Sequence, residues 1–254
     1  MRVMAIRNEQ EATVLTAPEY VALVRVICII FGCTAFWWGI DVFPDFWRDS
    51  SIEHLADRVL DGDSFKPEIM AGQSPAMHRI ESAGYCHPSA LRSAAVIQLR
   101  IVESLPPQSG QYEAELHSLL GLIRSSLSCA PADPFLWLAL YAVDNIANRF
   151  SVDDLKYLRM SYELGPNEGW IALRRNPAAF ERFHQLPPDL AAAAINEFIL
   201  LIKSNFFDSA AEIFVGPAWP ERELLLSHLA EISSDQRHFL SDALRQHGYD
   251  LEMP

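Results

Sequence analysis

The chain has 254 residues, half of them hydrophobic, and a formal net charge of −13 at pH 7. This length and composition allow a sizeable buried core and exclude a disordered chain. An acidic surface of this kind repels the phosphates of nucleic acids, so we expect no nucleic-acid partner. Only 11 glycines occur and long alternating β-branched runs are missing, so an all-α fold is predicted.

The first predicted element is an apolar helix near the N-terminus. Residues 20–40 contain Arg25 as their only charge, and about twenty helical residues cross the ~30 Å hydrocarbon core of a membrane. Aromatic side chains at both ends of the segment suit the two membrane interfaces. A transmembrane anchor is therefore predicted at 20–43, and Pro44 is expected to stop the helix.

The charges beside this segment predict its orientation. The N-terminal side carries Arg2, Arg7 and, near the start of the segment, Arg25. The C-terminal side carries Asp41, Asp45, Asp49 and one cation, Arg48. Positive flanks stay in the cytoplasm, so residues 1–19 are predicted to be the cytoplasmic tail of a single-pass bacterial inner-membrane protein with a periplasmic C-terminal domain. Three alternatives remain for the segment: a buried core helix, a cleaved signal peptide, and lipidation at Cys33.

The remainder of the chain is predicted to be helices joined by short loops. Residues 44–84 are interpreted as a short helix, 52–60, capped by Ser51, and a linker. Residues 85–254 show apolar positions at helical spacing, separated by prolines and glycines, and this pattern predicts an array of antiparallel helix hairpins. The helices are expected at 88–104, 112–128, 134–148, 153–163, 168–176, 177–185, 188–204, 206–215, 220–232 and 235–247.

The stretch 129–166 resembles a tetratricopeptide repeat. This family places a proline at the end of one repeat and a tryptophan six residues later, and Pro131 and Trp137 have that spacing. The closing proline is Pro166, 35 residues after the first, where about 34 is usual. Two positions depart from the pattern: Asp154, or Asp153 without the extra residue, lies where the family has a small alanine, and Tyr141 replaces a usual glycine. The resemblance implies one degenerate repeat within a tetratricopeptide-like helical array.

Gly165-Pro166-Asn167-Glu168 has the features of a corner between two helices. Gly165 is expected to end one helix in a left-handed cap, and Asn167 to cap the next helix, whose N-terminal dipole favours Glu168. With its flanks, 158–175, the motif resembles one in uncharacterised alphaproteobacterial, membrane-anchored, repeat-like proteins linked with exopolysaccharide and cell-envelope loci. That resemblance implies a cellular setting and no particular activity.

Six side chains are candidates for an interaction surface. Aromatic and cationic groups among them suit a sugar, a phosphate or an acidic peptide, although a purely structural helix corner is the alternative. The six are Trp137, Asn167, Glu168, Trp170, Arg174 and Arg175. Separately, Cys86 precedes one predicted helix and Cys129 follows the next, so an antiparallel hairpin would bring them together. A periplasmic location permits a disulfide there, and two unlinked thiols are the alternative.

No recognisable catalytic motif occurs in the sequence. It contains no GxSxG, P-loop or GxGxxG pattern, and its eight histidines form no H-x₃-H or HExxH spacing. We therefore expect no catalytic residue, no cofactor and no metal site. The leading hypothesis is a non-catalytic scaffold that binds protein partners in cell-envelope or exopolysaccharide biosynthesis or export. A glycan or small-ligand binding module is the second hypothesis, and an unrecognised polysaccharide-acting enzyme is the third.

Overall fold

The computed structural model describes residues 17–107 and 109–251. Within these residues the chain is all-α, with twelve α-helices, four short 3-10 helices and no strand. The chain divides into two compact units, Met1–Ser51 and Ile52–Pro254. Most of the expected cytoplasmic tail, 1–19, lies outside the described residues. The second unit, called the helical unit below, contains the candidate site.

The first helix, α1 (Ala17–Leu60), contains the predicted apolar segment. Its stretch Tyr20–Pro44 is long and apolar enough to cross a membrane, and none of it is buried inside the structure. A core helix would be mostly buried, so that alternative is wrong. An N-terminal apolar helix of this kind serves as a membrane anchor or as a signal sequence.

Two expectations about the end of this helix are wrong. The helix does not stop at Pro44 but continues through it to Leu60, so Ser51 lies inside the helix and caps nothing. A proline removes only one backbone donor, and the residues that follow have their own helical pattern. Ile52 and Ala56, which are four residues apart, are both buried in the helical unit, and this packing stabilises the last turns.

The predicted linker before residue 84 also contains two short helices, α2 (Pro67–Ala71) and α3 (Ser74–Glu81). Both have a proline in the first turn, where the missing N–H is no loss. Met70, Met77 and Ile80 are buried, so these helices belong to the core of the helical unit. They are too short for helical periodicity to separate them from a loop.

The next three helices agree closely with the predicted bounds. They are α4 (Pro88–Ser104), α5 (Gly110–Cys129) and α6 (Pro134–Asn148). Strong start signals explain the agreement. The Ser109 side chain accepts a hydrogen bond from the Tyr112 N–H at 3.0 Å, and Asp133 accepts one from the Phe135 N–H at 2.9 Å.

The C-terminal half continues with α7 (Leu155–Leu164), α8 (Gly169–Phe180), α9 (Pro188–Lys203), α10 (Phe207–Val215), α11 (Arg222–His228) and α12 (Ser234–Gln246). The 3-10 turns are Val152–Asp154, Phe183–Gln185, Trp219–Glu221 and Leu229–Glu231. The predicted break between 176 and 177 is absent, because α8 includes Pro177. Asp154, the departure from the repeat pattern, accepts the Ser151 N–H in a capping box.

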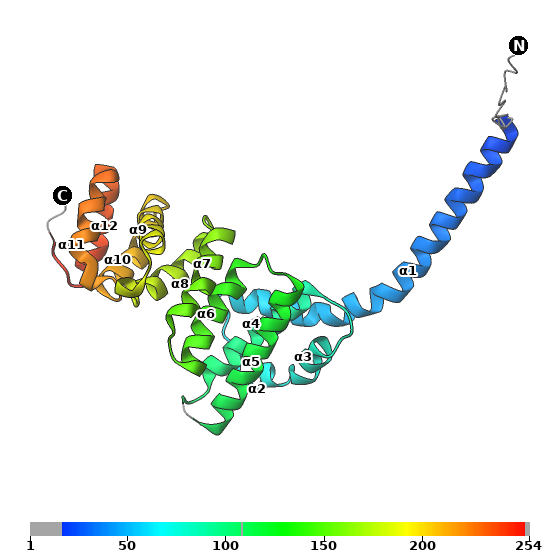
Figure 1. The fold of residues 1–254 in the computed structure, drawn as a ribbon, viewed down its shortest axis with the longest axis horizontal. Coiled ribbons are helices and arrows are strands. Elements are labelled where there is room, and N and C mark those ends of the chain that lie inside the picture. Colours follow the sequence, from blue (N-terminus) through cyan, green and yellow to red (C-terminus); the bar gives the residue numbers. More distant parts are fainter. Residues whose placement is uncertain (1–16, 108, 252–254) are drawn as a thin grey trace, which may run out of the picture. The chain divides into compact units, whose positions relative to one another are not determined.

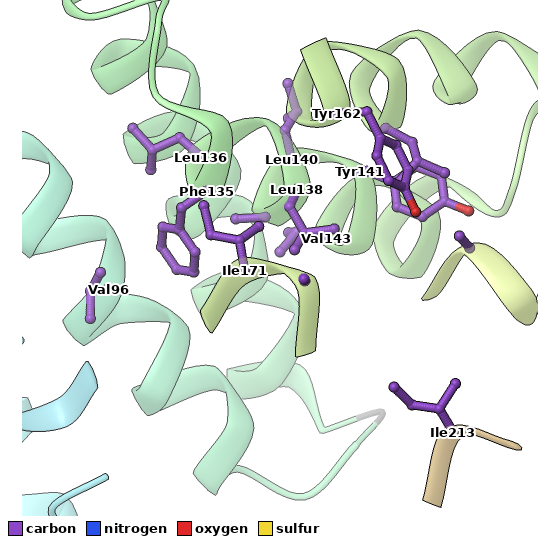
Figure 2. Packing of buried hydrophobic residues seen from close by; sticks show 14 of the residues in the cluster. Val96, Phe135, Leu136, Leu138, Leu140, Tyr141, Val143, Tyr162, Ile171 and Ile213 are labelled. Atoms are coloured by element: carbon purple, nitrogen blue, oxygen red, sulfur yellow. The ribbon is translucent and has the colours of Figure 1, made fainter. Parts of the chain in front are cut away.

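Helices in the helical unit pack mainly against their neighbours along the chain. Contacts join α4 to α5, α5 to α6, α6 to both α7 and α8, α8 to α9, α9 to α10, and α10 to α12 (Figure 1). Buried apolar residues fill these contacts. Figure 2 shows Phe135, Leu138 and Ile171 where α6 meets α8, and Tyr141 with Tyr162 where α6 meets α7. One continuous core therefore positions the surface described next.

Candidate interaction groove

An apolar groove of about 610 Å³ lies between α4, α5, α6 and α8. Leu138, Ala142 and Ile146 follow one another at intervals of four residues on α6, so they form one line along the groove. The other helices contribute Leu99, Val102, Tyr112, Leu116, Leu173 and Pro177. Every one of these side chains is apolar or aromatic, which is typical of a surface that binds a ligand or a partner.

One apolar side chain that lines the groove, Ile146, is well exposed to solvent. Ile146 is 58% exposed, although a β-branched apolar residue is normally buried. A second hollow of about 510 Å³ shares Pro107, Tyr112, Leu116 and Ile146 with the groove and extends it along α5. Both hollows are concave and lined mainly by apolar side chains, as binding sites for ligands commonly are.

The rim of the groove carries two charged residues, Glu103 and Arg174. Glu103 is paired with Arg100 on the same helix, with an Nη1–Oε2 distance of 2.9 Å. Arg174 is exposed, and in the described part of the chain its guanidinium has no ion pair or hydrogen bond. The groove therefore presents one cation that is free to bind an anionic group. The role of Arg174 as an interaction residue remains a prediction.

Arg175, the neighbouring candidate, is not part of any surface. Its side chain is 0% exposed, and its guanidinium binds inside the protein. Nε and Nη2 donate to Glu197 Oε1 at 3.0 and 2.5 Å. Nη1 donates to the Ser161 carbonyl at 2.5 Å, and Nη2 donates to the Gly165 carbonyl at 2.9 Å. The expectation that Arg175 contacts a ligand is therefore wrong, because its charge joins α7, α8 and α9.

The other oxygen of Glu197 is bound as well. The Tyr162 hydroxyl donates to Oε2 at 3.0 Å, and the Asn176 amide donates to it at 3.3 Å. Burial raises the pKa of the Glu197 carboxyl above its usual range, although the bonds from Arg175 act in the opposite direction. Burial also raises the pKa of Tyr162 well above 10.0, and the adjacent Glu197 charge adds to this effect. This buried network fixes the helix that carries Arg174.

The Gly165–Glu168 corner differs in detail from the prediction. Gly165 has φ −138° and is not in a left-handed cap. A Cβ atom on Gly165 would lie 2.7 Å from Pro134 Cγ, so close packing against α6 is what requires glycine. Asn167 and Glu168 are exposed, and neither side chain caps α8. Their role as interaction residues remains a prediction.

The two candidate tryptophans lie in different surroundings. Trp170 is 41% exposed and packs on Phe135 with 5.3 Å between ring centroids, and the Arg92 guanidinium lies 5.9 Å from its centroid. Trp137 is half-buried, and its indole N–H donates to the Pro131 carbonyl at 2.7 Å. The proline–tryptophan spacing of the repeat pattern thus corresponds to a hydrogen bond, so Trp137 has a structural role here.

Cys86 and Cys129 form a disulfide in the structure, with Cα atoms 5.6 Å apart. It joins the residue two before α4 to the last residue of α5, as expected for an antiparallel hairpin. Cys86 is exposed and Cys129 is half-buried, so a reductant has access to the bond. Cys28 and Cys33 are free and exposed on α1.

Among the described residues, one group with metal-ligand chemistry comes together: Asp208, Glu212 and His247. The sequence predicts no metal site, and no short motif indicates this one, because His247 lies 39 residues after Asp208. It lies on α10 and at the end of α12, whereas the groove involves neither helix.

No family model, curated protein or solved structure matches this chain. The resemblances to tetratricopeptide repeats and to envelope-associated proteins therefore remain expectations. The function is inferred from the apolar helix, the groove and its rim.

Proposed function

We propose that this protein is a membrane-anchored, non-catalytic interaction protein whose helical unit binds a partner protein in the groove. The observation that carries the proposal is a groove of about 610 Å³ whose lining is mainly apolar and includes the exposed Ile146. A partner segment with an apolar face and a carboxylate fits this surface, because Arg174 supplies an unpaired cation at the rim.

The tetratricopeptide-like arrangement belongs to this proposal. Helices α6 and α7 pack together after a connection that includes the 3-10 turn Val152–Asp154, and the Trp137–Pro131 hydrogen bond lies where the repeat pattern matches. Arrays of stacked helix pairs commonly present extended binding surfaces. The resemblance around Gly165–Glu168 favours a partner in cell-envelope or exopolysaccharide biosynthesis or export.

The proposed location is the bacterial inner membrane, crossed once by 20–43, with the helical unit in the periplasm. The apolar, unburied helix Tyr20–Pro44 and the cations on its N-terminal flank support this topology. Reporter fusions after Leu60 test it. A fused periplasmic phosphatase should be active and a fused cytoplasmic galactosidase silent, and the opposite pattern would contradict the orientation.

Partner binding is tested by co-purification from native membranes in mild detergent. Ile146→Glu places a charge in the lining of the groove, so it should remove the partner found with the wild-type protein. Val152→Glu is the matched control, because Val152 is 64% exposed and lies outside the groove. Recovery of the same partner with both variants, or of the bare protein in every case, would refute the proposal.

A glycan-binding module is the second candidate. Trp170 and Arg174 are one helical turn apart on α8 and both are exposed, which gives a ring and a cation on adjacent positions. Titration with acidic envelope oligosaccharides, followed by tryptophan fluorescence, separates the candidates. A saturable response lost in Trp170→Ala but retained in Ile146→Glu would favour this second function over protein binding.

A further inference from the structure

The contact between α10 and α12 places two carboxylates and an imidazole on the same patch. Asp208 and Glu212 are four residues apart on α10, so their side chains share one face of the helix. His247 directly follows the last residue of α12, and the two helices pack together. The packing of α12 on α10 therefore brings the imidazole to the acidic face.

The distances suit a single small cation. His247 Nε2 lies 3.1 Å from Asp208 Oδ1, and one ligand atom from each of the three residues lies within 4.8 Å of the other two. A zinc ion takes nitrogen and oxygen ligands at about 2.0–2.2 Å, so its ligand atoms lie roughly 3–4 Å apart. Small rotations of exposed side chains bring the three groups into that range.

The charges of the patch also indicate a cation. Two carboxylates four residues apart on a helix repel each other, and this arrangement lowers helix stability unless a positive charge lies between them. Asp208 has His247 as its partner, but the Glu212 carboxylate has no ion pair or hydrogen bond in the described part of the chain. Asp208 lies in the first turn of α10, where the helix dipole stabilises a negative charge. Glu212 lies one turn later, where the dipole no longer stabilises its carboxylate.

We propose that Asp208, Glu212 and His247 bind one divalent transition-metal ion, with Zn²⁺ as the expected ion. One imidazole nitrogen and two carboxylate oxygens select zinc or cobalt over calcium and magnesium, which prefer oxygen ligands alone. Water completes the coordination, because the side chains of Asp208 and His247 are 75% and 28% exposed. The ion links the end of α12 to α10 and stabilises the C-terminal part of the helical unit.

The test uses the full-length protein in detergent, without a histidine tag and after treatment with a chelator. Cys28→Ser and Cys33→Ser form the background, because free thiols are themselves zinc ligands. Isothermal titration with Zn²⁺ should give one site. Zn²⁺ at 100 times its dissociation constant should raise Tm by roughly 5–10 °C, since a ligand that binds only the folded state stabilises it.

Three variants separate a metal site from a surface ion pair. Glu212→Gln should weaken Zn²⁺ binding at least tenfold, without loss of stability in the absence of metal, because this carboxylate has no partner to lose. His247→Ala removes the nitrogen ligand and should abolish Zn²⁺ binding. His238→Ala should not, because His238 faces Asp242 on the same helix at 3.5 Å and has no third ligand among the described residues. No Zn²⁺ binding below about 1 mM, or equal binding by wild type and Glu212→Gln, would overturn the proposal.

Discussion

Arg175 and Glu197 form an ion pair inside the helical unit, where Nη2 of the arginine lies 2.5 Å from Oε1 of the glutamate. The two side chains are 0% and 4% exposed, so the pair is shielded from water. The preceding residue, Arg174, is exposed at the rim of the groove. One step along α8 thus separates an arginine that stabilises the fold from one that is available to a partner.

Arg175→Ala is expected to lower the free energy of unfolding by about 3–5 kcal/mol, because it leaves the Glu197 carboxylate buried without its counter-charge. Arg174→Ala, the adjacent control, should change stability by no more than about 0.5 kcal/mol. Denaturant unfolding followed by circular dichroism measures both. Equal losses of stability in the two variants would contradict the assignment of Arg175 to the core.

The pH dependence of stability tests the environment of Glu197. Burial raises the pKa of its carboxyl above 4.5, so between 4.5 and the folded-state value the native protein binds more protons than the unfolded chain. The stability contribution of this group is therefore full below about pH 4.5 and is lost as pH rises through the folded-state pKa.

Glu197→Gln removes this titration. The unfolding free energy of wild type minus that of Glu197→Gln should decrease as pH rises from about 4.5 and then become constant. Unfolding series from pH 4 to 8 measure the difference. An increase with pH would show that pairing with Arg175 outweighs burial and that the pKa of Glu197 is lowered instead.

The structure gives Gly165 a packing role. Gly165→Ala places a methyl group 2.7 Å from Cγ of the rigid Pro134 ring, and the required shift should cost about 1–3 kcal/mol. Gly110→Ala is the control, because nothing lies within 4 Å of its added Cβ. Thermal unfolding should show a lower Tm for the first variant and no loss for the second. A neutral Gly165→Ala would contradict the close contact between this corner and α6.

The Cys86–Cys129 disulfide should stabilise the helical unit, and it should form only if this unit lies in the oxidising periplasm. Cys86 and Cys129 are 43 residues apart, so loop closure predicts that losing the bond costs up to about 4 kcal/mol. Protein purified from cells should be two mass units lighter than reduced protein at these cysteines, and reductant should lower Tm. Two free thiols at these positions would contradict a periplasmic helical unit. Cys28→Ser is the control and should leave Tm unchanged, because Cys28 is not in the disulfide.

The sequence predicted best where local signals are strong. α4, α5 and α6 begin at a proline or beside a capping side chain, so their starts lie within two residues of the predicted ones. Neither Pro44 nor Pro177 breaks its helix, because a proline removes only one backbone donor. In α8, Ala179 and Phe180 beyond the proline are buried, and such packing does not appear in a local pattern. The helices α2 and α3 are too short for their apolar spacing to separate them from a loop.

The candidate site was predicted only in part. Arg174 lies on the groove rim, but Arg175 was misassigned although a signal existed: Ile171, Arg175 and Ala179 follow the helical spacing of the buried face. The groove and the Asp208–Glu212–His247 patch arise from packing between separate helices. Spacing within one segment does not reveal such contacts.

The most direct test of the central claim is site-specific photo-crosslinking in living cells. A photoreactive amino acid at Ile146, in the groove, should form one discrete adduct with a partner protein, identified by mass spectrometry. The same amino acid at Val152, which is exposed outside the groove, should form none, and Arg174→Glu should weaken the adduct at position 146. No adduct at 146, or the same adduct from both positions, would contradict a partner-binding groove.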